Sequence, residues 1–233
     1  IWKSKRMIIM TLLEAMQTRH SVRSYKSIPL KPEDILILQK EIDACNEEGG
    51  LHIQLVTNEP KAFDSFMAHY GKFSGVQNYI ALIGKKSAGL EERLGYYGER
   101  LVLLAQTLGL NTCWVAMTFG KGAAKSRCTL APGEKLVCVL SLGYGATQGA
   151  AHKSKPMETL CPAAGAMPEW FRRGMEAAML APTAMNQQKF TISLSGSTVT
   201  AKSSGGFYSK TDLGIVKYHF EIGAGKECFT WAK

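Results

Sequence analysis

Two arginines and a serine stand at alternate positions near the start of the chain, in the stretch Arg19-His20-Ser21-Val22-Arg23. Alternate side chains of an extended segment project from the same side, so Arg19, Ser21 and Arg23 would share one face. A guanidinium binds a phosphate through two parallel hydrogen bonds, and a serine hydroxyl can add another. The spacing therefore indicates an anion-binding segment, although a solvated basic turn between helices would have the same residues.

Composition limits the classes of protein to which the chain could belong. Its 233 residues are 45% hydrophobic and 20% charged, which is typical of a soluble globular protein with one large domain or two small ones. The net charge of +9 suits an anionic ligand or cofactor. No basic helix or aromatic-basic ribonucleoprotein pattern accompanies the charge, which argues against a nucleic-acid partner.

The cysteines and histidines indicate a reduced protein without a metal. The six cysteines contain no C-x-x-C pair, so we expect reduced core thiols in a cytoplasmic protein. The five histidines have no ligand spacing with one another or with the cysteines, so no metal site is predicted. No stretch approaches the length of a membrane span, and we interpret the apolar residues before Glu14 as the lead-in to a first helix.

Hydrophobic periodicity predicts alternating helices and strands, which favours a layered α/β or α+β sheet. Pro32 and Gly109 are typical of a helix start and a helix end. The predicted helices cover residues 7–17, 32–45, 61–69, 91–108, 168–180 and 212–224, and the predicted strands cover residues 51–56, 79–83, 111–117, 135–142, 190–194 and 199–201.

Three further stretches lie between these elements. The glycines from Gly143 to Gly149 have the spacing G-x-G-x-x-x-G with no helix after them, which indicates a loop at a strand end and not a dinucleotide-binding turn. Residues 152–156 are cationic and could reach a phosphate or be solvated. Residues 157–167 follow Pro156, contain Pro162 and several small residues, and are predicted to be a linker.

A pair of similar segments suggests an internal duplication. Gly98 and Gly109 are separated by 11 positions, as are Gly214 and Gly225, and a cysteine and a tryptophan follow each pair; the offset is 116 residues. Upstream landmarks at residues 44 and 181 are offset by 137 residues. We therefore expect two half-repeats, residues 7–156 and 168–233, related by a pseudo-twofold axis within a single domain of residues 7–233, although chance glycines are the alternative.

These motifs together resemble the FMN-dependent nitroreductase family, in the branch that fuses two related halves in one chain. Residues 19–23 match its R-x-S-x-R motif, and residues 181–190 match its A-P-S-x-x-N-x-Q-P-W motif, with Thr183 in place of serine and Lys189-Phe190 in place of Pro-Trp. Residues 108–114 resemble its L-G-L-G-T-C-W stretch. The resemblance implies a nitroreductase-like fold, with a central, mostly antiparallel sheet flanked by helices.

The resemblance also implies a site for FMN between the two halves. Arg19, Ser21, Lys153 and Lys155 would bind the phosphate, and Arg23 would lie at N1 and O2 of the flavin. The backbone near Val115 and Ala116 would face N5, and Pro182, Thr183, Asn186 and Gln188 would hold the ring from the other half. The full set of candidate cofactor-binding residues is Arg19, His20, Ser21, Arg23, Trp114, Val115, Ala116, Lys153, Lys155, Pro182, Thr183, Ala184, Asn186 and Gln188.

The activity implied by the resemblance is an NAD(P)H:acceptor oxidoreductase. Hydride would pass from NADH or NADPH through flavin N5, by a ping-pong route, to a nitroaromatic or quinone acceptor. No catalytic side chain is required, because the flavin performs the chemistry. One chain would build one site, as a monomer that resembles the family's dimer. A flavin-binding protein without turnover, used for storage or sensing, is the alternative.

Overall fold

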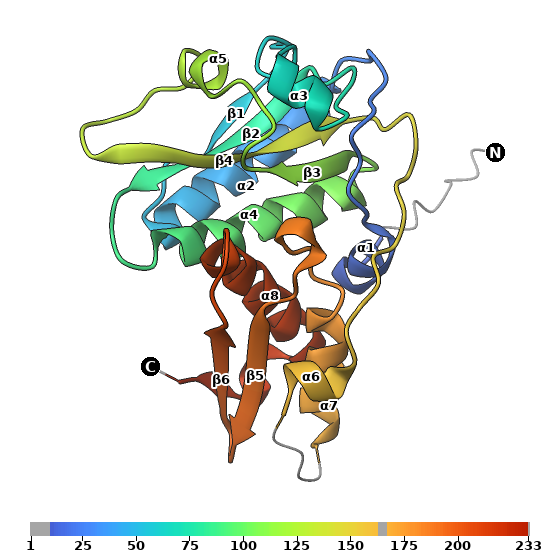
Figure 1. The fold of residues 1–233 in the computed structure, drawn as a ribbon, viewed down its shortest axis with the longest axis vertical. Coiled ribbons are helices and arrows are strands. Elements are labelled where there is room, and N and C mark those ends of the chain that lie inside the picture. The colour runs from blue at the N-terminus through green and yellow to red at the C-terminus, as the bar shows by residue number, and fades with distance from the viewer. Residues whose placement is uncertain (1–9, 163–166, 233) are drawn as a thin grey trace, which may run out of the picture.

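The computed structural model of the protein describes residues 10–162 and 167–232. Its larger sheet contains β1 (Gln54–Val56), β2 (Asn78–Lys85), β4 (Glu134–Gly143) and β3 (Asn111–Val115), in that spatial order and with every neighbouring pair antiparallel. A smaller sheet contains β5 (Phe190–Ser195), β6 (Thr198–Ser203) and β7 (Thr230–Trp231), and β7 runs parallel to β6. Helices flank both sheets, so the predicted α+β fold with a mostly antiparallel sheet is confirmed (Figure 1).

The first two helices have the end signals that their sequences predict. Thr11 and Glu14 form a capping box at the start of α1 (Leu12–Thr18). α2 (Pro32–Gly49) has a proline in its first turn and ends at Gly50, whose φ of 58° is left-handed. The other long helices are α4 (Leu90–Thr107), α7 (Glu169–Ala178) and α8 (Ser209–Ala224).

The structure differs from the predicted elements in its short segments. Helix α3 (Phe66–Tyr70) is shorter than predicted because the Ser65 side chain accepts a hydrogen bond from the Ala68 amide and starts the helix there. The expected linker begins with a helix, α6 (Met157–Leu160), so the prediction of an irregular segment is wrong there. Helix α5 (Lys121–Lys125) was not predicted, and residues 7–9 and 163–166 lie outside the described residues.

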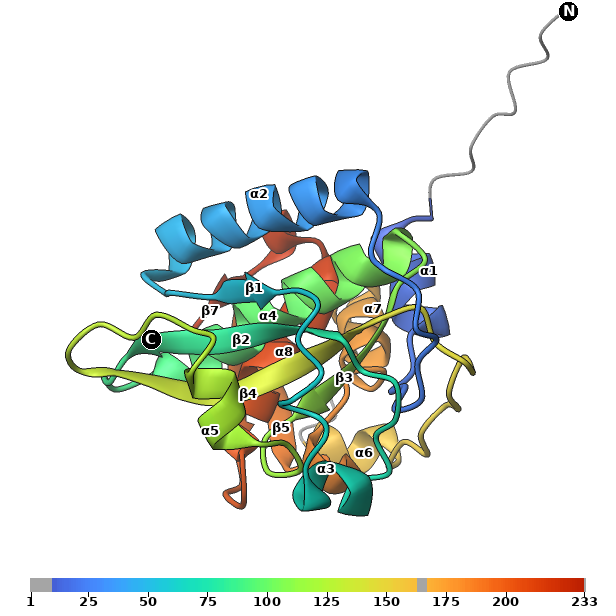
Figure 2. The ribbon, with the colours of Figure 1, turned by 90° about the horizontal axis from the view of Figure 1, so that it is seen from above.

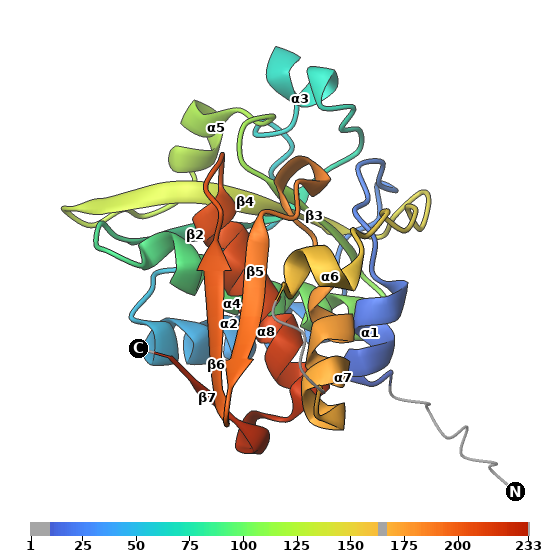
Figure 3. The same ribbon diagram turned by 60° about the horizontal axis from the view of Figure 1, so that its bottom comes forward.

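The elements are stacked in layers that follow the chain. α2 lies along one face of the larger sheet, and α4 packs against the same face (Figure 2). α8 packs on the other side of α4 and separates it from the β5–β6 hairpin (Figure 3). α1 lies beside α7 in spite of their distance in the sequence, because Ala15 and Met16 are buried against Ala177. The first and last thirds of the chain therefore meet.

Two glycines allow α4 and α8 to approach closely. A Cβ added to Gly95 of α4 would overlap the carbonyl oxygen of Thr211, and one added to Gly214 of α8 would overlap the carbonyl oxygen of Glu92. The two contacts mirror each other. Gly214 follows Gly95 by 119 residues, and Thr211 follows Glu92 by the same number. The backbones of the two helices are in direct contact at this crossing.

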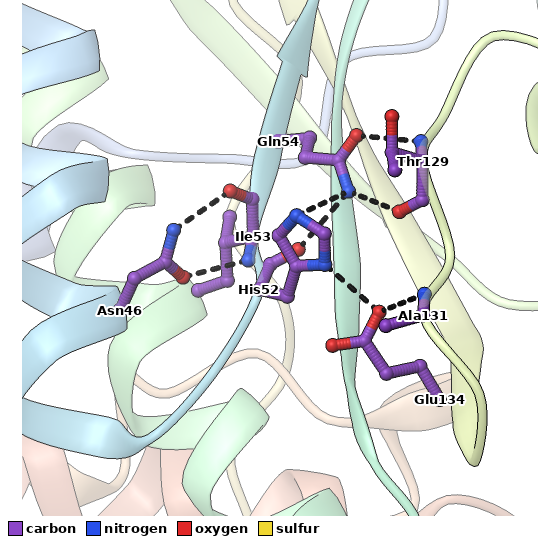
Figure 4. A network of polar contacts seen from close by, with 7 residues as sticks. All are labelled: Asn46, His52, Ile53, Gln54, Thr129, Ala131 and Glu134. Carbon is purple, nitrogen blue, oxygen red and sulfur yellow. Dashed lines mark hydrogen bonds and ion pairs between the residues drawn. The ribbon is translucent and has the colours of Figure 1, made fainter.

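A polar network joins the segment of the edge strand β1 to the loop before β4 (Figure 4). His52 Nδ1 lies 2.8 Å from Glu134 Oε2, which also accepts a hydrogen bond from the Ala131 amide. The Gln54 side chain donates to the carbonyl of Thr129 and accepts from its amide. These contacts reach across β2 and fasten the loop before β4 to the β1 segment.

Within residues 10–162 and 167–232, no helix is long and apolar enough to cross a membrane. Among the same residues, no group of histidine, cysteine and acidic side chains is placed to hold a metal ion.

Candidate functional site

The segment after α1 is extended because it pairs with two neighbouring segments. The Val22 amide donates to the Thr112 carbonyl in β3, and the Tyr25 amide donates to the Ser74 carbonyl. Val22 is buried against the larger sheet, and Tyr25 is anchored there by hydrogen bonds of its hydroxyl with the Val22 carbonyl and Ser141 Oγ. Because Val22 points into this core, Arg19, Ser21 and Arg23 project from the other side, as the alternation predicts, and the alternation ends at Tyr25.

These three side chains line a cavity of about 580 Å³, a volume typical of small-molecule sites. The cavity lies between the extended segment, the end of β3, the turn after α7 and the start of α8. Arg19 and Asn186 both line it, although 167 positions separate them in the sequence (186 − 19). Ten of the fourteen candidate residues line it: Arg19, Ser21, Arg23, Trp114, Val115, Ala116, Pro182, Thr183, Ala184 and Asn186.

The remaining four candidates, His20, Lys153, Lys155 and Gln188, are not among the residues that line the cavity. Lys155 Nζ donates to the carbonyls of Gln187 and Gln188. The Gln188 side chain donates to the Lys153 carbonyl and accepts from the Lys155 amide. Residues 153–155 therefore support the turn that borders the cavity. Burial and the neighbouring Arg19 lower the pKa of His20, which favours a neutral imidazole.

The turn after α7 has an unusual backbone. Met185, Asn186 and Gln188 have positive φ values of 51°, 53° and 45°, which are costly for residues with a side chain. Side chains from elsewhere hold the turn: Asp212 of α8 accepts hydrogen bonds from the Ala184 amide, at 2.9 Å, and from Gln187 Nε2, at 2.7 Å. Gln187 Nε2 also donates to the Phe207 carbonyl. The turn is thus tied to the start of α8.

The end of β3 forms another wall of the cavity. Trp114 lines the cavity, and its indole Nε1 donates to Glu99 Oε2 at 2.8 Å. The Ala116 carbonyl accepts a hydrogen bond of 3.5 Å from the Tyr208 hydroxyl, which connects this wall to the loop before α8. The wall is therefore tied to α4 on one side and to the loop before α8 on the other.

Arg19 lacks the partners that a buried guanidinium normally has. Its side chain is 4% exposed, yet Nε and Nη1 have no hydrogen-bond partner among the described residues. The nearest carboxylate oxygen in an ion pair, Glu99 Oε1, is 4.0 Å from Nε, which is too long for a hydrogen bond. A buried cation without partners is costly, and an anion in the cavity that Arg19 lines would offset its charge. The site therefore fits an anionic ligand.

Burial changes the titration of several groups that line the cavity. It raises the pKa of Asp212 from 3.8 to about 6, against the two hydrogen bonds that this carboxylate accepts. Burial also raises the pKa of the Cys138 thiol to about 12 and that of Cys113 above its ordinary value. Both thiols are therefore protonated at neutral pH, and neither is activated as a nucleophile.

Sequence reasoning missed about half of the residues that line the cavity. Cys113 and Met185 lie inside motifs that were recognised, so their neighbours pointed to them. His152 lies in the cationic segment that was singled out for its lysines. Asp212, Thr211 and Ile215 are on α8 and carry no local signal. The lining residues that lie outside the fourteen candidates are Cys113, Met117, Cys138, Ala150, His152, Met185, Phe207, Tyr208, Thr211, Asp212 and Ile215.

The chain is similar in sequence to a known protein family. Residues 11–224 match the family model described as "Putative TM nitroreductase". The chain belongs to this nitroreductase family. The matched residues contain every element that borders the cavity. No curated protein matches the chain.

Solved structures share the nitroreductase fold at low sequence identity. One from Thermotoga maritima, described as a "putative nitroreductase", is 20% identical with a TM-score of 0.67, and the match covers 97% of this chain and 89% of that one. A structure from Desulfovibrio desulfuricans, described as a putative nitroreductase in complex with FMN, is 16% identical with a TM-score of 0.53; the match covers 67% of this chain and 98% of that one. A nitroreductase-like protein from Streptococcus mutans has the same coverages, 14% identity and a TM-score of 0.54.

Proposed function

We propose that the protein is an FMN-dependent NAD(P)H:acceptor oxidoreductase of the nitroreductase type. The observation that carries the proposal is the buried Arg19, which lines a cavity together with Ser21 and Arg23 and whose Nε and Nη1 have no hydrogen-bond partner among the described residues. A guanidinium fork and a hydroxyl on one face suit a phosphate, and FMN supplies one. The solved nitroreductase in complex with FMN has the same fold and supports this choice of cofactor.

Each wall of the cavity would have its own task. Arg19 and Ser21 would bind the phosphate, and Arg23, whose guanidinium stacks 5.7 Å from the centre of the Phe73 ring, would face N1 and O2. The backbone at Val115 and Ala116 would lie against N5. When bound, FMN supplies the redox chemistry, a ping-pong hydride transfer through N5 from NADH or NADPH to a nitroaromatic or quinone.

The turn at residues 182–186 would hold the flavin from the opposite side. Pro182, Thr183, Ala184 and Asn186 line the cavity there. For Lys155 and Gln188 we propose a supporting role instead of contact with the cofactor, because their hydrogen bonds join the 153–155 segment to this turn. The exposed Met117, Met185 and Phe207 give the cavity an apolar rim that suits a flat aromatic acceptor.

We also propose that the chain is a fused pair of nitroreductase-like halves, residues 7–156 and 168–233, that builds one site and acts as a monomer. The reciprocal contact between α4 and α8 supports a pseudo-twofold relation, with a register of 119 residues where glycine spacing predicts 116. The free thiols of Cys45, Cys113, Cys128, Cys138 and Cys228 support a reducing compartment such as the cytoplasm.

The experiment that tests this function uses the purified full-length chain. We expect a yellow protein with the visible spectrum of oxidised flavin, one FMN per chain, and bleaching by NADH or NADPH in the absence of oxygen. A flavin that binds but is not reduced would favour the alternative, a flavin-binding protein without turnover. A chain that neither carries nor takes up FMN would refute the proposal.

A further inference from the structure

Behind Arg19 lies a buried group of polar side chains from three separate segments. Glu99 of α4 and His219 of α8 are both fully buried. The Glu99 carboxylate accepts from Trp114 Nε1 at 2.8 Å, faces His219 Nε2 at 2.9 Å and lies 4.0 Å from Arg19 Nε. Buried charged residues are costly unless their charges and hydrogen bonds are satisfied, so the protons in this group matter.

The carbonyl of Ala177 determines where one of these protons lies. It lies 3.1 Å from His219 Nδ1, and a carbonyl oxygen can only accept, so Nδ1 carries a proton. The contact between His219 Nε2 and Glu99 Oε1 then needs one more proton between its two atoms. This proton gives either an imidazolium beside a carboxylate or a neutral imidazole beside a carboxylic acid. The pair has no net charge in either form.

A pair without net charge does not neutralise Arg19. We infer that Glu99 and His219 form a proton-sharing pair that positions Arg19 from behind and leaves its positive charge available to an anion in the cavity. In the simpler alternative, an ionised Glu99 beside a neutral His219, two lone pairs would face each other across 2.9 Å, and the carboxylate would cancel the charge of Arg19. Glu99 and His219 do not line the cavity, so they act through Arg19 and Trp114.

Replacing the imidazole tests the inference directly. His219→Gln removes the shared proton, so Glu99 becomes an unshared carboxylate beside Arg19. We expect the affinity of the FMN-free full-length chain for inorganic phosphate, measured by calorimetry, to fall at least about tenfold, because a full negative charge then lies close to the binding guanidinium. Unchanged phosphate affinity in a folded H219Q protein would overturn the inference.

Replacing the carboxylate should have little effect. Glu99→Gln can accept from Trp114 through its oxygen and donate to a neutral His219 through its nitrogen, so the net charge behind Arg19 stays the same. We expect phosphate affinity within about threefold of wild type, and a gain of about tenfold or more would show that Glu99 normally cancels the charge. The double variant E99Q/H219Q should recover the affinity that H219Q loses; a purely structural role for His219 would not be rescued in this way.

One measurement needs no substitution. In the nitrogen NMR spectrum of the wild-type histidines, the most slowly exchanging ring should carry a proton at Nδ1, and an unprotonated Nδ1 there would overturn the inference even if the variants do not fold. The inference rests on the proposed function only for the identity of the anion. A wild-type chain that binds phosphate but not FMN would refute the function alone, whereas one that binds neither would refute both.

Discussion

Gly95 of α4 and Gly214 of α8 lie against each other where the two helices cross, and neither position has room for a Cβ. The atoms that a Cβ would meet are backbone atoms, which cannot move aside as a flexible side chain would. The crossing also places His219 against Glu99 and the start of α8 beside the cavity. A single helix contact thus supports both the packing of α4 against α8 and the geometry of the site.

We expect Gly95→Ala and Gly214→Ala each to lower the free energy of unfolding by about 2 kcal/mol or more, because a methyl group forces the helix backbones apart. Denaturant unfolding followed by circular dichroism measures the change. Gly122→Ala is the matched control: its Cβ would point into open space in α5, so we expect a change of less than about 1 kcal/mol, in the stabilising direction. Equal effects at all three positions would contradict the close approach.

Arg19→Ala should weaken FMN binding by about 100-fold, because two charge-assisted hydrogen bonds to the phosphate are lost. Arg19→Lys keeps the charge but not the fork, so its affinity should lie between those of the alanine variant and wild type. Quenching of free FMN fluorescence on binding gives the dissociation constants. Arg127→Ala, at a half-exposed arginine outside the cavity, serves as the control. Wild-type affinity in R19A would exclude Arg19 from the phosphate site.

Arg23→Ala should make the reduction potential of the bound flavin more negative, since a cation near N1 and O2 stabilises the anionic reduced form. A tenfold change in the two-electron equilibrium corresponds to about 30 mV, and we expect a shift of at least this size. Anaerobic dye-coupled titration measures the potential. Arg23→Lys should recover most of it, and an unshifted potential in R23A would place this guanidinium away from the ring.

Asp212 should make the protein less stable as the pH rises. Its pKa is about 6 in the folded protein and 3.8 in the unfolded reference, so between these values the folded state holds a proton that the unfolded state has lost. The difference of about two pH units corresponds to about 3 kcal/mol. Relative to wild type, Asp212→Asn should therefore gain up to that amount in free energy of unfolding between pH 4 and pH 7. Asp43→Asn, at an exposed position in α2, should show no such trend.

Glu134, in the polar network that joins β1 to the loop before β4, should make the protein more stable as the pH rises. The hydrogen bond with His52 is the main cause that lowers the pKa of Glu134, so its contribution is present above the ordinary carboxyl range and is lost as the pH falls through it. We expect Glu134→Gln to cost about 1 kcal/mol near neutral pH and less in acid. Glu47→Gln, at an exposed position in α2, is the control. A cost in E134Q that does not diminish in acid would be inconsistent with a role for the ionised form.

The parts of the site that could be predicted from sequence are those where the local backbone conformation fixes the side to which each side chain points. Arg19, Ser21 and Arg23 share a face because the backbone there is extended, and a period of two residues is a local property. The strands of the larger sheet were recognised as apolar runs, since most of β2 and β4 is buried. Asn186 was found through its motif, although its left-handed backbone has no signature in the sequence.

The residues that escaped prediction depend on how helices pack. Glu99, His219 and Asp212 lie on helices whose sequences do not tell which neighbour each face will meet. Asp212 contacts the turn at 184–187 only because the helix crossing brings the start of α8 there. Glycine spacing in the sequence pairs Gly98 with Gly214, 116 residues apart. In the structure Gly95 meets Gly214, 119 residues apart, and the spacing alone does not decide between the two pairings.

The cavity takes its walls from residues 19–23 and from a helix that begins at Ser209, which has a consequence for biosynthesis. While the ribosome is still making α8, the basic segment has already emerged and has only part of its enclosure. Whatever the site binds can be held firmly only after the residues of α8 have also emerged. A nascent chain that stalls or terminates before this helix would expose a half-built, positively charged surface to the cell.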